Sequence, residues 1–433
     1  MSTSLFWFRS DLRLHDQAAL RAACTGGTRH LLPVFCLPPL DAVTAWGFAR
    51  MGPARQAWLA AALGELAQQL ERLGCPLLLC AGPPSTTLPA LASALGIDRI
   101  VCEQIAAPQE QAEVAALRAA GLDVHEVWQS SLLDPAALPW PAAGLPATFT
   151  PFRQALEHAA IVPPAPLAAP ASLPPWPPGA VIPAHLRADL AALASVTGDP
   201  RSSLQDSAGH YTGGERAGLA HLARYLAREL PQTYKQTRNG LSGADFSSKW
   251  SPWLATGALS ARRILAELRQ YEARHGASDG SYWLWFELLW RDYFRLLHLQ
   301  YGSALYRARG LGQQPLGPHN GEGFARWCAG RTGEGLVDAA MSELAATGYL
   351  SNRLRQVVAS YLIYEVGGDW RAGAAWFEAQ LLDYDVYSNQ GNWLYIAGRG
   401  TDPRGGRRFN VGKQTADHDG DGAYRQRWAA PQS

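Results

Sequence analysis

The chain has 433 residues, which is enough for two or three domains. Hydrophobic residues make up 47% of it and charged residues 17%, a balance that supports a large core and excludes global disorder. The net charge is +1, so no overall basic field points to nucleic acid. The six cysteines and eleven histidines show no metal-ligand spacing, and no apolar run reaches membrane-spanning length. We therefore expect a monomeric, cytoplasmic protein with no metal site and no membrane segment.

The first part of the chain alternates short apolar runs with helical segments. The apolar runs cover residues 4–8, 31–37, 77–80 and 100–102, with a weaker one at 124–127. The helical segments between them include residues 55–73 and 109–120. Strands that alternate with helices are typical of βαβ units around a parallel sheet. Residues 1–130 are therefore predicted to form an α/β, Rossmann-like domain, although no GxGxxG follows the first run.

A proline-rich segment separates this domain from the rest. Residues 162–183 hold nine prolines, which exclude a continuous helix or a central strand and indicate an extended connector. We place the connector at residues 131–205. From residue 206 to 433 the apolar residues recur at helical spacing, so the second domain is predicted to be all-α.

The polar residues between positions 349 and 395 form two clusters. Asn352, Arg353 and Arg355 open this segment, and Asp383, Asp385 and Asn389 close it. Arg355 stands at the start of a predicted core-packed helix, where its charge needs a partner, and Asp383 is a natural one. Such an arrangement suits an enclosed site for a polar, electron-accepting group. The alternative is a helical core with one structural ion pair, and these residues alone do not decide between the two.

Three serines precede a predicted helix that begins near Pro252. Ser247, Ser248 and Ser251 offer hydroxyl donors to an anionic phosphate, and the start of a helix adds free N–H groups. The alternative is that Ser251 only caps the helix, with proline at its first position. Capping requires one serine, however, and does not explain the other two.

An aromatic helix is predicted from residue 283 to 294. It carries Glu287 and Arg291 four residues apart on one face, with Trp290 beside Glu287. By itself this pattern indicates an ordinary ion pair on a core helix. Together with the polar clusters it becomes a candidate wall of one cavity.

Four blocks in order resemble the photolyase/cryptochrome family. They are WFRSDLRLHDQAAL, TYKQTRNGLSGADFSSKWSPWLATGALS, FELLWRDYFR, and the run from MSELAATGYLSNRLRQVVASYL to LLDYDVYSNQGNWLY. The DASH branch is favoured by TRNG after Tyr234, by Gln356 after SNRLR and by Tyr395 two residues beyond Trp393. The segment from Trp128 to Arg153 also resembles that branch. The resemblance covers nearly the whole chain.

This resemblance implies an α/β antenna domain and an all-α domain that binds FAD. Asn352 would face the flavin N5, and the Arg355–Asp383 pair would lie at the isoalloxazine. The remaining cofactor contacts would come from Tyr234, Ser247, Ser248, Ser251, Arg291, Asp385 and Asn389. The substrate pocket would be lined by Glu287, Trp290, Arg353, Gln356 and Tyr395, with Arg238 and Arg407 on DNA phosphates. Glu287 and Asn352 would be the catalytic residues.

The family resemblance leads to three hypotheses. The first is light-driven repair of cyclobutane pyrimidine dimers by electron transfer from reduced FAD, with a preference for single-stranded DNA. The second is a blue-light photoreceptor that signals through a protein or nucleic-acid partner, and the third is a light-independent nucleotide-binding protein. A methenyltetrahydrofolate antenna is expected to bind weakly or not at all, because Gln104 and Ile105 take the place of its usual acidic residue and Glu103 is displaced.

Electron supply to the flavin is the remaining question. Family members relay electrons through three tryptophans, and Trp393 and Trp370 match the inner two. The loop that would hold the outer one, residues 310–322, contains no tryptophan and no tyrosine. Tyr306 or Trp327 are possible substitutes. We expect Trp393→Phe and Trp370→Phe each to slow photoreduction of FAD.

Overall fold

A computed structural model describes residues 3–97, 99–141, 144–204 and 211–429. Its N-terminal domain is built on five parallel strands in the order β3-β2-β1-β4-β5. The strands are β1 (Thr3–Phe8), β2 (His30–Cys36), β3 (Leu78–Cys80), β4 (Arg99–Glu103) and β5 (Asp123–Val127). The predicted parallel, Rossmann-like sheet is confirmed. Its order reverses between β1 and β4, which is where such sheets open a crevice at their carboxyl edge.

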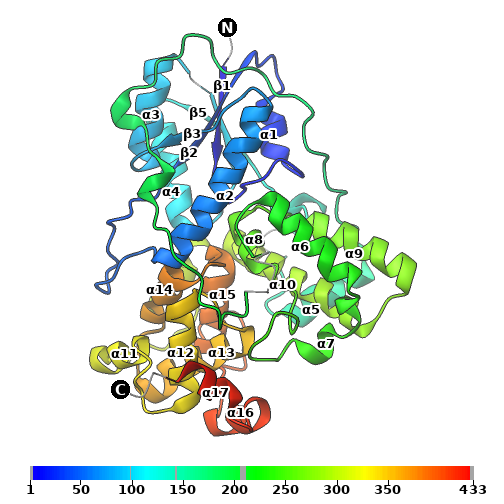
Figure 1. The fold of residues 1–433 in the computed structure, drawn as a ribbon, viewed down its shortest axis with the longest axis vertical. Coiled ribbons are helices and arrows are strands. Elements are labelled where there is room, and N and C mark those ends of the chain that lie inside the picture. Colours follow the sequence, from blue (N-terminus) through cyan, green and yellow to red (C-terminus); the bar gives the residue numbers. More distant parts are fainter. Residues whose placement is uncertain (1–2, 98, 142–143, 205–210, 430–433) are drawn as a thin grey trace.

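Helices cover both faces of this sheet (Figure 1). On one face α1 (Ala18–Ala23) and α2 (Pro53–Arg72) enclose a core that includes Phe6, Phe8 and Phe35. On the other face α3 (Pro84–Leu95) and α4 (Pro108–Ala119) pack against Leu5, Trp7 and other strand residues. Side chains alternate along each strand, so both faces of β1 are apolar and buried.

Between residues 211 and 429, the structure consists of helices joined by turns and loops, as predicted. The helices are α6 (Glu215–Ala227), α7 (Tyr234–Thr237), α8 (Ser251–Thr256), α9 (Ala261–His275), α10 (Asp279–Tyr301), α11 (Gly321–Cys328), α12 (Gly335–Thr347), α13 (Asn352–Tyr361), α14 (Trp370–Gln380), α15 (Val386–Ala397), α16 (Val411–His418) and α17 (Ala423–Trp428). A π-helical turn at Leu362–Val366 extends α13. One large hydrophobic core joins these helices, with α10 at its centre.

The predicted connector contains both extended chain and one helix of the helical core. Residues 162–183 form no helix or strand and run back over the N-terminal domain, where the Leu31 N–H donates to Pro175 O at 3.1 Å (Figure 1). Before them, α5 (Phe149–His158) packs on α10, and the Phe149 ring stacks on Trp290 with centroids 3.9 Å apart. The predicted boundary at residues 205–206 lies outside the described residues.

The charged turn after β1 joins the two domains. Arg13 donates to Gly257 O at 2.9 Å, and Asp16 pairs with Arg262 at 3.0 Å. His15 Nδ1 lies 2.5 Å from a carboxylate oxygen of Glu215 at the start of α6. Arg13, His15 and Asp16 are buried, and each charge meets a partner from the helical domain. The turn therefore fixes α6, α8 and α9 against the sheet.

The described chain lacks two features, a membrane-spanning helix and a metal-binding cluster. None of its helices is long and apolar enough to cross a membrane. Within the same residues, no group of three or more His, Cys, Asp and Glu side chains could hold a metal ion.

Asp292 on α10 provides a test of this packing. Its buried carboxylate accepts the backbone N–H groups of Leu132 and Leu133, at 3.1 and 2.8 Å. Asp292→Ala leaves both donors unsatisfied, so we expect the free energy of unfolding to fall by about 2–4 kcal/mol. Urea unfolding followed by tryptophan fluorescence measures this change. Asp292→Asn, which keeps one oxygen, should lose less. Equal stability of the alanine variant and the unchanged protein would contradict the assignment.

Candidate functional site

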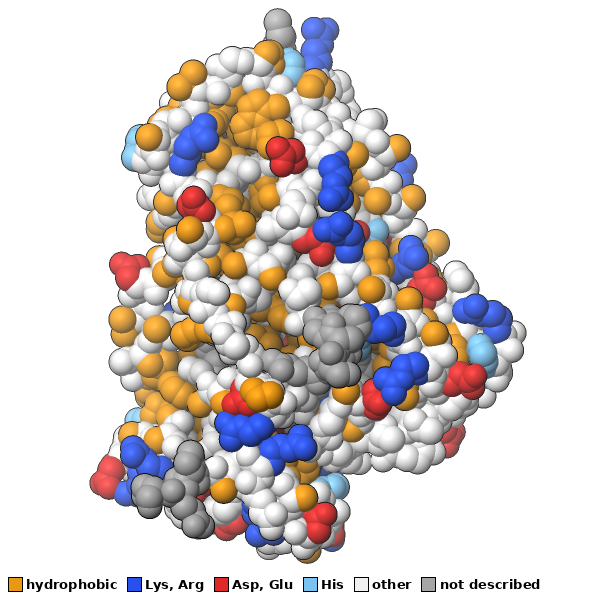
Figure 2. Space-filling model, in the orientation of Figure 1, with side chains coloured by type: hydrophobic (Ala, Val, Ile, Leu, Met, Phe, Trp, Pro, Cys, Tyr) orange, Lys and Arg blue, Asp and Glu red, His pale blue; other side chains and the backbone are white. Residues whose placement is uncertain are grey.

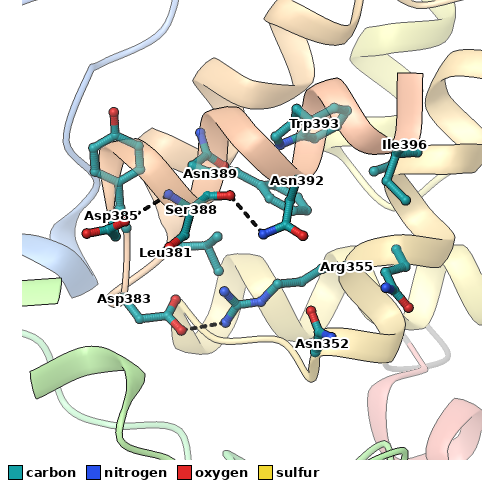
Figure 3. Close-up of a pocket in the computed structure, with 14 residues that line it drawn as sticks. Asn352, Arg355, Leu381, Asp383, Asp385, Ser388, Asn389, Asn392, Trp393 and Ile396 are labelled. Atoms are coloured by element: carbon teal, nitrogen blue, oxygen red, sulfur yellow. Dashed lines mark hydrogen bonds and ion pairs between the residues drawn. The ribbon is translucent and has the colours of Figure 1, made fainter. Parts of the chain in front are cut away.

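Two helix starts, α13 and α15, bring the polar clusters of the sequence together. Ser351 caps α13 by accepting the Leu354 N–H at 3.3 Å, and Asp385 caps α15 by accepting the Ser388 N–H at 2.8 Å. Figure 3 shows Asn352 and Arg355 on one helix facing Ser388 and Asn392 on the other. The predicted convergence of the two clusters is therefore present.

The ion pair between Arg355 and Asp383 lies between these helices (Figure 3). The guanidinium donates to one carboxylate oxygen of Asp383 at 2.8 Å and to Leu350 O at 3.0 Å. The Asp383 side chain is only 1% exposed. Burial lowers the pKa of Arg355, but the Asp383 charge outweighs it and the pKa lies above its ordinary value. The other oxygen, Oδ1 of Asp383, is buried without a hydrogen-bond partner among the described residues.

Two adjoining cavities meet at this pair. The first, which we call the ion-pair pocket, has a volume of about 540 Å³ and is bounded by α13, α15 and the segment between α14 and α15. The second, the serine cavity, has a volume of about 1480 Å³ and extends toward α7, α8 and α10. Both are lined by the same polar group: Asn352, Arg355, Gln356, Asp383, Ser388 and Asn392. Together they form one continuous polar and aromatic site.

The serine cavity collects the predicted phosphate-binding residues. Tyr234, Ser247, Ser248, Ser251 and Arg291 all line it. The alternative interpretation of Ser251 as a simple cap is wrong, because Trp250 holds the cap position of α8 and no side chain caps this helix. The Ser251 side chain is instead exposed toward the cavity.

Lys249 is a cavity residue that sequence reasoning missed. Its ammonium lies 3.3 Å from the centre of the Phe246 ring and 4.6 Å from that of Tyr349, and it donates to the Tyr349 hydroxyl at 3.2 Å. Burial sets its pKa well below the ordinary value. Lys249 is one of three lysines in the chain and adjoins the serines, which was the available signal.

Glu287, Trp290 and Arg291 all line the serine cavity, and the alternative of an ordinary Glu287–Arg291 ion pair on α10 is wrong. Glu287 pairs with Arg238, which follows α7, and burial raises the pKa of its carboxyl group. Arg291 turns to the backbone instead, and donates to Ser130 O and to Leu254 O, the latter at 3.2 Å. Glu287 and Arg291 thus each bind a partner that is far away in the sequence, although they lie one helical turn apart. Trp290 faces Tyr395 at 6.1 Å between ring centroids.

The remaining predicted residues surround the site at different depths. Arg353 donates to Asn239 at 2.9 Å and to Gln356 at 3.3 Å. Arg407 donates to the Tyr395 hydroxyl at 2.8 Å and pairs with Asp402 at 2.9 Å. These two arginines line neither cavity, whereas Gln356 and Tyr395 do.

Two further predicted cofactor residues, both on or beside α15, make their own contacts. Asp385 pairs with Arg295 at 3.2 Å, and Asn389 donates to Ala374 O at 3.0 Å. Both also line the ion-pair pocket.

Of the two predicted relay tryptophans, one reaches the site. Trp393 lines the ion-pair pocket beside Phe377. Trp370, at the start of α14, is 1% exposed and donates to Ala308 O at 3.0 Å. It is not among the pocket residues.

A third cavity, which we call the sheet-edge cavity, lies at the switch point of the sheet. It has a volume of about 1770 Å³ and separates the carboxyl ends of β1, β2 and β4 from α14 and α15. Glu103 and Ile105 line it, and Gln104 does not. Burial, followed by the charge of Asp11, raises the pKa of Glu103 to about 7. Glu103 thus places a buried carboxyl group at the wall of this cavity.

Comparison with known proteins identifies related chains. The sequence matches the family described as DNA photolyase over residues 4–171 and that described as FAD binding domain of DNA photolyase over residues 283–431. A cryptochrome DASH from Gloeobacter violaceus is 43% identical over 437 residues, covering 98% of this chain and 85% of the relative.

Solved structures share the fold. The cryptochrome of Synechocystis sp. PCC6803 superimposes with a TM-score of 0.92 at 40% identity, covering 99% of this chain and 88% of that one. A class III photolyase from Agrobacterium tumefaciens gives a TM-score of 0.79 at 30% identity, with 99% and 86% covered.

The Arg355–Asp383 pair gives a prediction that needs no ligand. Arg355→Met strands a buried carboxylate, and we expect it to lower the free energy of unfolding by about 3–5 kcal/mol. The double variant with Asp383→Leu should recover much of that loss. Urea unfolding of the two single variants and the double variant measures the coupling.

The matched control is Arg263→Met. Arg263 pairs with Glu267 one turn along α9 at 2.7 Å, in a more exposed setting. Its loss should stay within about 1 kcal/mol. Equal effects at both sites would show that the Arg355 charge is not desolvated.

Proposed function

Because this chain belongs to the photolyase/cryptochrome family and is most like its DASH-type cryptochromes, we propose that it repairs cyclobutane pyrimidine dimers with light, preferring single-stranded DNA. The observation that carries this proposal is the continuity of the two cavities. A cofactor pocket with a buried ion pair opens directly into a space walled by Glu287, Trp290 and Tyr395. A pyrimidine dimer placed in this space would lie next to a group bound in the ion-pair pocket.

The residues present fit FAD. The unpartnered Oδ1 of Asp383 calls for a hydrogen-bond donor from a bound group, and a flavin ring supplies N–H donors at its edge. The three serine hydroxyls and Lys249 suit the anionic diphosphate. With its phosphates in place, the buried ammonium of Lys249 gains a counter-charge, which would restore its protonated form.

Each group has a defined task around the cofactor. When bound and reduced, FAD supplies the light-driven electron that opens the cyclobutane ring. Arg355 and Asp383 would hold the ring edge, and the amides of Asn352 and Asn389 line the same pocket within reach of it. Arg291 lines the serine cavity and is anchored to the backbone oxygens of Ser130 and Leu254, so its charge would be available to a diphosphate bound there.

The proposed substrate-binding wall of the serine cavity combines aromatic and polar side chains. Trp290 offers one indole face, and Tyr395 and Gln356 stand where more apolar groups would stack better. Stacking contributes about 1–3 kcal/mol per base, and flipping a dimer out of a duplex costs a few kcal/mol. A wall with one indole offsets less of that cost. Damage in single strands avoids it, which is the reason for the proposed preference.

The proposal is tested with oligonucleotides that contain one thymine dimer. Purified protein carrying FAD should split the dimer into two thymines under blue light, and faster in a single strand than in a duplex of the same sequence. Glu287→Gln, which keeps the side chain's shape and removes its charge, should slow repair in both substrates. Dark incubation and an oligonucleotide with a pyrimidine–pyrimidone photoproduct serve as controls.

The outcomes separate the parts of the proposal. Equal rates on both DNA forms would contradict the strand preference and leave the repair activity standing. A colourless protein that cannot be reconstituted with FAD would contradict the assignment as a whole.

The sheet-edge cavity is proposed as the antenna position, with weak retention of methenyltetrahydrofolate. Because its pKa is raised to about 7, the Glu103 carboxyl is largely neutral at mildly acidic pH and holds a cationic pterin poorly. We expect a substoichiometric near-ultraviolet antenna band after reconstitution, stronger at pH 8 than at pH 6. A stoichiometric band at both pH values would contradict this.

A further inference from the structure

A chain of aromatic rings leads from the ion-pair pocket to the molecular surface. Trp393 meets Phe377 at 5.1 Å between ring centroids, and Phe377 meets Trp327 at 6.3 Å. Trp327 stacks on Phe324 at 6.0 Å, and Phe324 meets Trp46 at 6.5 Å. Every step lies within the range of direct ring contact. The chain thus contains three indoles, each separated from the next by one phenyl ring.

Trp46 stands at the outer end of this chain, on a loop of the N-terminal domain. In Figure 1 that loop, between β2 and α2, descends beside α14. It is held there by the Arg50–Glu378 pair at 2.7 Å and by the Gly52 N–H, which donates to Ala379 O at 2.8 Å. Trp46 is half-buried and packs edge-on against His319 at 5.1 Å. His319 belongs to the loop in which an outer tryptophan was expected and not found.

Among the residues that the structure describes, no comparable run of ring pairs leads from Trp370 to the surface. Trp370 is 1% exposed, and the ring pairs that lead outward from Trp393 pass through Phe377 and Trp327 and do not include it. Its only hydrogen bond there goes to the backbone oxygen of Ala308. The continuous run of ring pairs from Trp393 to the surface therefore passes through Trp327.

We propose that Trp46 is the terminal electron donor of this protein, connected to the cofactor through Trp327 and Trp393. The proposal rests on the proposed function, since it requires bound FAD. Trp393 gives one electron to the light-excited oxidised flavin, Trp327 gives one to the Trp393 radical, and Trp46 gives one to the Trp327 radical. An external thiol then reduces Trp46, so each pass oxidises one thiol and adds one electron to the flavin.

The environments of the three indoles favour this direction. Trp327 is fully buried, and its Nε1–H donates to Val358 O at 3.0 Å, so its radical cation cannot release a proton to water. Trp46 is half-buried and borders solvent, which stabilises a cation and accepts its proton. The proton is regained when the thiol reduces Trp46. Phe377 and Phe324 bridge the indoles without being oxidised.

The test compares single variants of the FAD-loaded protein by transient absorption. Trp46→Phe and Trp327→Phe should each lower the yield of the long-lived tryptophanyl radical several-fold, and Trp370→Phe should lower it less. Trp393→Phe should abolish it. Trp285→Phe, a half-buried indole on α10 outside the chain of rings, is the matched control and should leave the yield unchanged. The flavin absorbance per protein and the melting temperature establish that each variant is folded and loaded.

A second readout locates the radical directly. Illumination with a nitroso spin trap, followed by peptide mass spectrometry, should place the adduct on Trp46. Full loss of the radical in Trp370→Phe with no effect of Trp46→Phe would overturn the proposal. So would an adduct on Trp376, the other half-buried indole of this region, which contacts Phe48. In either case a response to Trp393→Phe would leave the proposed function intact, whereas its absence would contradict both.

Discussion

The site depends on one buried ion pair. Arg355 and Asp383 lie 28 positions apart, on elements that meet only in the folded helical domain. Bringing both charges out of water costs several kcal/mol, and a pair of this kind adds little stability over apolar residues. The ion pair therefore acts mainly by holding two segments of the chain in position. The pair ties the start of α13 to the segment before α15, and Oδ1 of Asp383 has no hydrogen-bond partner among the residues that the structure describes. A bound group that donates to this oxygen would complete the interaction, which is the role proposed for the cofactor.

The same rule governs how the two domains meet. The turn after β1 buries Arg13, His15 and Asp16, and the helical domain supplies a partner for each. Arg291 likewise satisfies itself on Ser130 and Leu254, one backbone oxygen from each side of the boundary. Because unpaired buried charges are costly, these contacts admit few alternative arrangements of the domains. The cavity walls, which come from different parts of the chain, are therefore held in one fixed arrangement.

Local patterns predicted the elements well, because short apolar runs and helical periodicity are properties of neighbouring residues. They also predicted the Arg355–Asp383 pair, since a charge at the start of a core helix has few possible partners. They did not decide the points at which distant segments compete. Glu287 takes Arg238 and not Arg291, Trp250 displaces Ser251 from the cap of α8, and Trp46 joins the helical core from the N-terminal domain. No spacing in the sequence reports such contacts.

Trp290 and Tyr395 are each held by a residue that does not line the serine cavity. Phe149 from α5 stacks on Trp290, and Arg407, itself paired with Asp402, donates to the Tyr395 hydroxyl. Arg407 was expected to contact DNA phosphates. The Arg407 Nε–H donates to the Tyr395 hydroxyl and an Nη–H donates to Asp402, so the observed contacts of this guanidinium orient Tyr395. A ring that is already oriented loses little entropy when a base stacks on it. In the proposed function, this orientation would partly offset the weak stacking that Tyr395 and Gln356 offer beside Trp290.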